Sequence, residues 1–134
     1  MKLLRCLILA IAVMAACTNP VCGCPPLRSA TAMVWGHVTD SGLPRSNAIM
    51  LVAMRDPGTP CVLPGAMIER GNNDAQGSFR IMLFKEVELD SVCVFVGARL
   101  GSGNDAQYAV RGPFWLRFRY DVPFDSANVN LAFP

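Results

Sequence analysis

Apolar side chains recur at every second residue in several segments of this chain, and this period of two constrains the fold more than any other feature. In residues 114–121 (FWLRFRYD), every even position is apolar or aromatic, and every odd position except Trp115 is charged. Successive side chains of a β-strand point to opposite faces, so the pattern predicts a strand with one buried face. From Thr31 onward, no segment has the apolar period of a convincing helix.

Clusters of Gly, Pro, Asn and Asp separate the other apolar stretches and predict turns between strands. The expected strands cover residues 32–39, 47–55, 66–70, 78–84, 92–100, 114–121 and 129–133. About seven short strands, with turn signals roughly every 8–15 residues, are typical of two packed sheets. We therefore expect an all-β fold, an antiparallel Greek-key β-sandwich.

The first 16 residues (MKLLRCLILAIAVMAA) have the layout of an export signal. Lys2 and Arg5 give a positive start, and an apolar run at 7–16 ends in small residues. The run is shorter than the ~20 residues that a membrane-spanning helix needs. We expect residues 1–16 to be a signal peptide and the protein to be exported.

The end of this segment, Met14-Ala15-Ala16-Cys17, resembles the lipobox of bacterial lipoproteins. The resemblance implies cleavage before Cys17 and a lipid such as palmitate on its sulfur, which would anchor the protein in a membrane. Met14 stands where the family usually has Leu. Ordinary signal-peptide cleavage is therefore an alternative to lipoprotein-type cleavage. In bacterial lipoproteins, an Asp directly after the lipid-accepting cysteine favours retention in the inner membrane. This chain has Thr18 there, so the resemblance implies an outer-membrane lipoprotein facing the periplasm or the cell surface.

Residues 17–30 contain Pro20, Pro25 and Pro26 and no apolar period, which predicts a flexible tether before a domain at 31–134.

The whole chain has 12 Lys and Arg against 10 Asp and Glu. Removing the signal peptide removes Lys2 and Arg5, so the remaining 118 of 134 residues carry 10 charges of each sign. Nucleic-acid binding needs a basic surface, so this class of partner is not expected.

The cysteines fit an exported protein stabilised by disulfides. In this interpretation Cys6 would leave with the signal peptide and Cys17 would accept the lipid. The thiols that remain are Cys22, Cys24, Cys61 and Cys93. Of three possible connectivities we expect one in which Cys61 pairs with Cys93, joining a loop to a strand and contributing about 3–4 kcal/mol. The pairing of Cys22 and Cys24 is left undecided by the sequence. These two thiols are free, form disulfides between molecules, or form disulfides with the domain.

Two short motifs in the first part of the domain follow a family pattern. Residues 34–48 (VWGHVTDSGLPRSNA) are similar to a Val-x-Gly-x-Val strand followed by a Gly-x-Pro turn, and residues 73–79 (NDAQGSF) to a Thr-Asp-x-x-Gly-x-Phe turn with Asn73 in place of Thr. Over about residues 33–100 the chain thus resembles the carboxypeptidase regulatory-like domains. This resemblance implies a transthyretin-like sandwich that acts as a folding or docking appendage and lacks catalytic residues.

Several of these positions have a structural explanation of their own. Gly36 suits a bulge or a close approach from the opposite sheet. Gly42 and Gly77 are expected to take positive φ at strand junctions, and Asp74 to turn its carboxylate back onto turn amides.

Trp115, Arg117 and Arg119 are the best candidates for recognition. On a strand they project to one face, where an aromatic plate flanked by cations suits a sugar, an anionic polymer or a partner protein. The alternatives are that this face is covered, or that the guanidinium groups only stack over Trp115 in solvent.

Catalysis has little support in the sequence. His37 is the single histidine, with Ser41 and Ser46 nearby, but no nucleophile motif accompanies it. Zinc-ligand spacing is absent, and Asn72–Asp74 with Asp105 lack the spacing of a calcium loop. We expect no catalytic residue, no metal and no cofactor.

These features predict a non-catalytic binding or structural module of the cell envelope, whose partner is another envelope protein or a surface glycan. One alternative is a small secreted hydrolase or an accessory subunit of one. The other is a thiol-exchange carrier that acts through Cys22 and Cys24.

Overall fold

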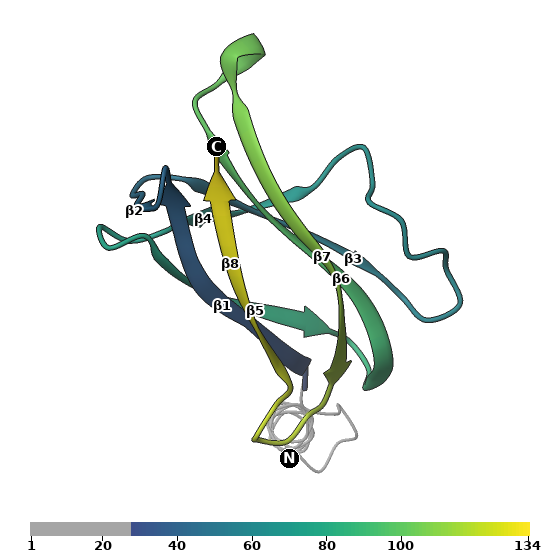
Figure 1. Cartoon of the computed structure of the whole chain (residues 1–134). Coiled ribbons are helices and arrows are strands. Elements are labelled where there is room, and N and C mark those ends of the chain that lie inside the picture. Colours follow the sequence, from purple (N-terminus) through teal and green to yellow (C-terminus); the bar gives the residue numbers. More distant parts are fainter. Residues whose placement is uncertain (1–27) are drawn as a thin grey trace, which may run out of the picture.

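The protein is a two-sheet β-sandwich (Figure 1) in a computed structural model that describes residues 28–134. Its strands are β1 (Ala30–Asp40), β2 (Leu43–Pro44), β3 (Ile49–Arg55), β4 (Ile68–Asn72), β5 (Ser78–Lys85), β6 (Leu89–Leu100), β7 (Gln107–Phe118) and β8 (Ser126–Phe133). A 3-10 turn, η1 (Gly103–Asp105), lies at the tip of the β6–β7 hairpin. The expected all-β sandwich is confirmed. The predicted signal peptide, lipid-accepting Cys17, Cys22 and Cys24 lie outside the described residues.

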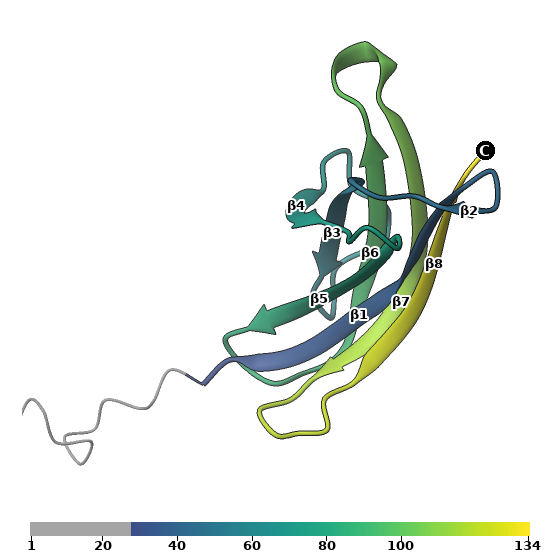
Figure 2. The ribbon, with the colours of Figure 1, turned by 90° about the vertical axis from the view of Figure 1, so that its left-hand side faces the viewer.

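The two sheets have four strands each (Figure 2). In the first sheet, β1 is central and pairs with β5, with β8 and, at its end, with β2. The second sheet has the order β4-β3-β6-β7. All pairs are antiparallel except β1 and β8, which run parallel. The β1–β8 pair is the exception to the expected antiparallel arrangement, because the chain crosses from the end of β7 to the first sheet and enters β8 beside the start of β1.

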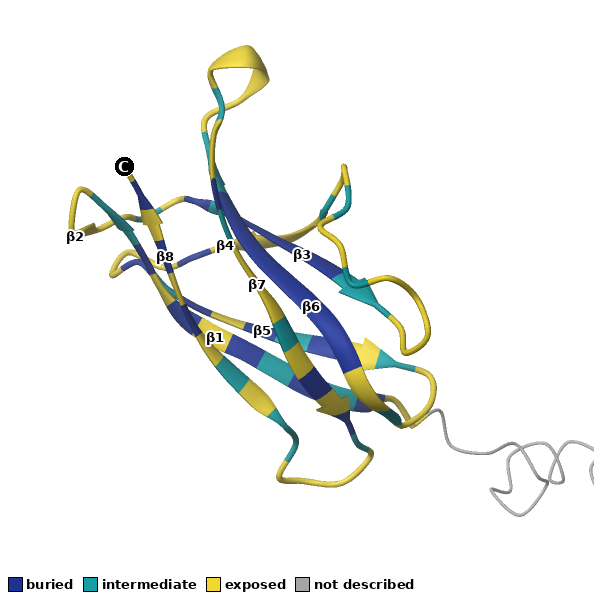
Figure 3. Cartoon of the chain, turned by 45° about the vertical axis from the view of Figure 1, so that its right-hand side comes forward, coloured by how far each residue is buried: buried dark blue, intermediate teal, exposed yellow. Residues whose placement is uncertain are grey.

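The core fills the space between the sheets with the residues that the period of two places inward. Figure 3 shows buried and exposed positions alternating along β1 and β7, whereas the middle of β6 is buried on both faces. The largest fully buried side chains are Phe118, Met50, Leu83, Leu131, Val34 and Val38. Each buried side chain of this size contributes about 1.5–3 kcal/mol, so the inner faces hold the sheets together.

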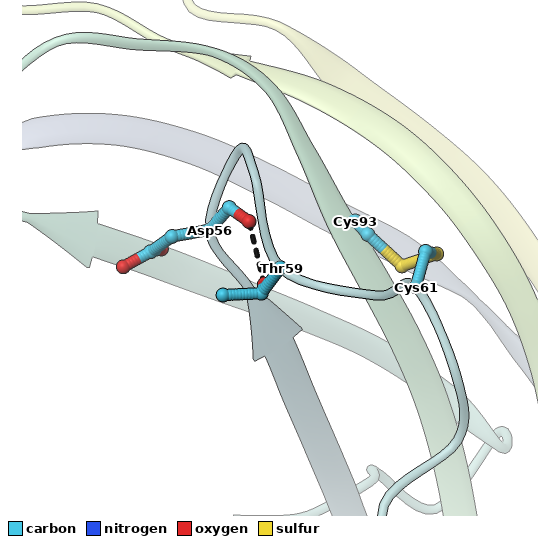
Figure 4. The surroundings of a disulfide bond; sticks show 4 residues. All are labelled: Asp56, Thr59, Cys61 and Cys93. Atoms are coloured by element: carbon cyan, nitrogen blue, oxygen red, sulfur yellow. Dashed lines mark hydrogen bonds between the residues drawn. A yellow bond between two sulfur atoms is a disulfide. The ribbon is translucent and has the colours of Figure 1, made fainter.

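The outer face of the second sheet is partly covered by the loop between β3 and β4 (Figure 4). Cys61 in this loop forms a disulfide with Cys93 on β6, with a Cα–Cα distance of 5.9 Å. Cys93 joins Ala53 and Phe95 in a small buried cluster, against which Met67 packs. The disulfide is the one expected from the sequence, and it fastens a long loop over an apolar part of the sheet.

The strand β7 begins earlier than the sequence predicts, at Gln107 rather than Phe114. The alternation is weak in this first part of the strand, and Pro113 lacks an amide hydrogen for a sheet ladder. Proline is tolerated because β7 is an edge strand, where one side of the backbone needs no partner.

Two turn predictions are confirmed and one packing prediction needs correction. Gly42 and Gly77 have φ of 82° and 78°. The Oδ1 atom of Asp74 accepts hydrogen bonds from the backbone amides of Gln76 and Ser78. Gly36 does permit a close approach, but the neighbour is β8 of its own sheet rather than the opposite sheet: a Cβ there would lie 1.9 Å from the carbonyl oxygen of Val129.

Candidate functional site

Trp115 and Arg117 lie on the outer face of β7, as the alternation predicts. Leu116 and Phe118 between and after them are buried in the core. The Trp115 side chain is 57% exposed, and its strand position is directly opposite Cys93 of β6. The loop that carries Cys61 therefore covers the neighbouring strand but leaves the indole open to solvent.

A hollow of about 540 Å³ lies in front of these two residues and is referred to below as the Trp115 hollow. It is lined by Trp115, Arg117, Arg119, Pro123, Phe124 and Asp125. The last three residues belong to the β7–β8 loop and were not predicted from the sequence. They have no apolar period, and they reach the hollow only because this loop folds back along the free edge of β7.

Hydrogen bonds of Asp125 hold this loop in place. Its Oδ2 accepts from the backbone amide of Arg117 at 2.9 Å, and its Oδ1 from the amide of Ser126 at 3.0 Å. Its backbone oxygen accepts from the amide of Met33 on β1 at 2.9 Å. The wall of the hollow is thus tied to both sheets, which favours binding because a ligand has little of this wall to order.

The two arginines of the predicted surface are not equivalent. The guanidinium of Arg119 donates a hydrogen bond to Asp90, and its Nη1 donates to the backbone oxygen of Phe118 at 3.1 Å. The hydrogen bond to Asp90 raises the pKa of Arg119, and nearby carboxylates such as that of Glu88 add to the rise. Within residues 28–134, the Arg117 side chain makes no ion pair. Arg117 is therefore the cation beside Trp115 that can meet a ligand.

His37 lies apart from the serines that are close to it in sequence. It is exposed on the outer face of β1, directly opposite Ser78 of β5. The hydroxyl of Ser41 bonds instead to Asp40 at 3.2 Å. Among the described residues, no hydrogen bond joins His37 to Ser41 or Ser46. The arrangement does not form the nucleophile and base pair of a hydrolase.

A second hollow, of about 480 Å³, lies on the outer face of the first sheet. Its lining includes Trp35, His37, Asn72, Asp74 and Arg80. No binding site is predicted from the sequence at this position. The strand pattern places Trp35 and His37 on one face, but it does not say that Arg80, which is 45 residues away from Trp35, lies beside them.

Neither a membrane-spanning helix nor a metal cluster is found in the described part of the chain. No helix among residues 28–134 has the length and hydropathy to cross a membrane. In the same residues, no group of three or more His, Cys, Asp or Glu side chains is arranged to hold a metal ion.

Comparisons with known proteins assign no family. No family model and no curated protein matches the chain. Among solved structures, a 9R-lipoxygenase from Cyanothece PCC8801 is similar with a TM-score of 0.36 and 19% sequence identity. The similarity covers 87% of this chain and 17% of the lipoxygenase chain.

Proposed function

We propose that this protein is a non-catalytic binding module of the bacterial cell envelope, anchored in the outer membrane by lipid on Cys17. In this proposal residues 17–30 are the tether and the sandwich is a carboxypeptidase regulatory-like domain. The partner is another envelope protein or a surface glycan. The observation that carries the proposal is the exposed indole of Trp115, which shares a hollow with the guanidinium of Arg117, a group that makes no ion pair within residues 28–134.

The chemistry of the Trp115 hollow favours a ligand with a flat apolar surface next to an anionic group. An exposed Trp offers a large rigid contact area, and Arg binds carboxylate or phosphate in a bidentate manner. Trp and Arg are also the residue types that most often dominate binding energy at interfaces. Phe124 adds a second aromatic ring to the same hollow.

The position of the hollow suits a tethered domain. Arg119, which lines it, makes two backbone hydrogen bonds with Thr31, at the start of β1. The hollow is therefore at the end of the sandwich where the tether enters. The twelve residues from Thr18 to Ser29 span at most about 40 Å when fully extended, which would keep this end close to the membrane.

Site-specific photocrosslinking in the native envelope tests the binding function. A benzophenone amino acid at Pro123, on the exposed rim of the Trp115 hollow, should capture the partner. Trp115→Ala or Arg117→Ala should reduce the captured species at least about tenfold, because each removes one of the two ligand contacts. Mass spectrometry of the product identifies a protein partner, whereas an added mass that glycosidases remove from the crosslinked protein is a glycan.

The matched control is Tyr108→Ala. Tyr108 is on the same strand and, like Trp115, is 57% exposed, but it lies near the hairpin tip. This variant should capture the partner as the parent does. Equal capture by all three variants would show that the Trp115 hollow is not the binding surface. In the same samples, mass spectrometry should find an acylated N-terminal Cys17, and Cys17→Ser should release the protein from the membrane.

A further inference from the structure

We propose a second binding site, for a neutral oligosaccharide, on the outer face of the first sheet around Trp35. The site goes beyond the proposed function, since Trp35 and Trp115 lie on the outer faces of different sheets. Its central row consists of three residues in direct register across three strands: Arg80 of β5, Trp35 of β1 and Asn128 of β8. The next row along the strands is Ser78, His37 and Asn130.

Strand geometry brings the side chains of both rows to one surface. Directly opposed residues share a face of the sheet, and in the antiparallel β1–β5 pair their Cβ atoms are about 4.5–5.5 Å apart. Residues two apart on one strand share that face as well. The indole of Trp35 therefore has polar side chains on both sides and along its own strand. This Trp35 face is defined by Trp35, His37, Arg80, Asn128 and Asn130.

The polar groups of the Trp35 face are available to a ligand. Trp35 is 38% exposed, and the four polar residues are exposed. Among residues 28–134, the side chains of His37, Arg80, Asn128 and Asn130 make no hydrogen bond with another protein group. A hollow of about 480 Å³ extends from Trp35 over His37 and Arg80, within the usual range for small-ligand sites.

The backbone beneath the Trp35 face is rigid. β1 is paired on both sides along most of its length, with β5 and with β8. At the edge of the hollow, Asp74 binds the amides of Gln76 and Ser78 at 2.9 and 2.7 Å and fixes the turn before β5. A ligand therefore meets side chains whose backbone positions are already set, which lowers the entropy cost of binding.

The chemistry of the face selects a sugar. A pyranose ring has one apolar face of C–H groups, which packs on an indole, and hydroxyl groups around its rim. Asn carboxamides both donate and accept hydrogen bonds, and Arg donates several, so the flanking residues suit those hydroxyls. Asp74 lines the same hollow, and among the described residues only its Oδ1 accepts backbone amides, so its charge offsets that of Arg80 and favours a neutral ligand over an acidic one. In the Trp115 hollow, by contrast, both carboxylate oxygens of Asp125 are bound by backbone amides. The polar flanks also differ from the apolar centre of a typical protein interface.

The two tryptophans allow binding to be located by fluorescence, since the chain contains no others. Trp115→Phe leaves Trp35 as the reporter, and Trp35→Phe leaves Trp115. Each full-length variant is titrated with neutral hexasaccharides of β-1,4-glucose, α-1,4-glucose and N-acetylglucosamine. The sugar concentration reaches about 10 mM, so that a dissociation constant near 1 mM can be detected. We expect at least one of these sugars to shift the emission of Trp35 and to leave that of Trp115 unchanged.

Side-chain variants then test the assignment by calorimetry with the sugar that binds. Trp35→Ala should weaken binding at least about tenfold, and Arg80→Ala or Asn128→Ala about three- to tenfold. Tyr108→Ala, an exposed aromatic far from this face, should bind as the parent does. Circular dichroism confirms that each variant keeps its strands.

Three outcomes would overturn the proposal. The first is that no neutral hexasaccharide shifts Trp35 emission at the highest concentration. The second is that Trp35→Ala binds as tightly as the parent. The third is a shift confined to Trp115, which would move the glycan to the Trp115 hollow and so support the proposed function while removing the second site.

Discussion

The side-chain oxygen of Asn73 accepts a hydrogen bond of 2.9 Å from the backbone amide of Ala48, 25 residues away in the chain. The amide nitrogen of the same side chain donates to the backbone oxygen of Arg45 at 2.5 Å. Asn73 is 6% exposed and is the one buried polar residue among residues 28–134. It joins the turn before β5, a strand of the first sheet, to the segment that leads into β3 of the second.

Asn73→Ala should lower the free energy of unfolding by about 1–3 kcal/mol, because it leaves a buried amide and a carbonyl without partners. Urea denaturation followed by tryptophan fluorescence measures the change. The control is Asn72→Ala at the exposed neighbouring position, which should stay within about 0.5 kcal/mol of the parent. Equal stabilities of the two variants would contradict a bridging role for Asn73.

Removing the Cys61–Cys93 disulfide should cost about 3–4 kcal/mol, because it closes a loop across a sequence separation of 32 residues. Proteolysis between Asp56 and Met67 should accelerate, since the loop then loses its covalent link to β6 and keeps the apolar contacts of Met67 and the ion pair between Asp56 and Lys85. The double variant Cys61→Ala/Cys93→Ala is compared with the parent, with and without reductant. Reductant should destabilise the parent alone; an equal loss in the double variant would assign the effect to another cysteine.

Gly36→Ala should destabilise the pairing of β1 and β8 by more than about 3 kcal/mol, because the new methyl group would overlap the backbone of Val129 and two paired strands have little room to separate. Hydrogen exchange at the β8 amides should speed up most. Gly65→Ala is the control, since a Cβ there has no atom within 4 Å. Unfolding of both variants at the parent's urea concentration would contradict a tight β1–β8 contact at Gly36.

Asp90→Asn should free Arg119 and make the surroundings of Trp115 more attractive to anions. In a Trp35→Phe background, iodide should quench Trp115 about twofold more strongly at low salt, and the gain should disappear near 1 M salt, where charges are screened within ~3 Å. Quenching by neutral acrylamide should not change. Glu69→Gln, which frees Arg99 elsewhere on the surface, is the matched control.

The same ion pair predicts how this contact depends on pH. Asp90 raises the pKa of Arg119, so any stability linked to that shift is present below the ordinary pKa of arginine and is lost only as the pH rises through the raised value. Arginine stays protonated between pH 5 and 9 with or without Asp90, so deprotonation of Arg119 should not alter the quenching result in the parent or in Asp90→Asn. A loss of the iodide effect across this range would mean that another group controls it.

Some of the candidate site could be predicted from the sequence because it depends on neighbouring residues. Trp115 and Arg117 share an exposed face since both are odd positions of one strand whose even positions enter the core. The part of the Trp115 hollow contributed by Phe124 and Asp125 could not be predicted. Its placement depends on where the β7–β8 loop crosses between sheets, and no local pattern encodes that path.

The sequence by itself determined that the domain is all-β, which side chains face inward, and which turns need glycine, because these follow from backbone geometry over a few residues. The tertiary structure alone decided that β8 lies parallel to β1 and that Arg80, Trp35 and Asn128 form one row. Strand pairing is a competition among segments far apart in the chain, and a period of two is the same for every candidate partner.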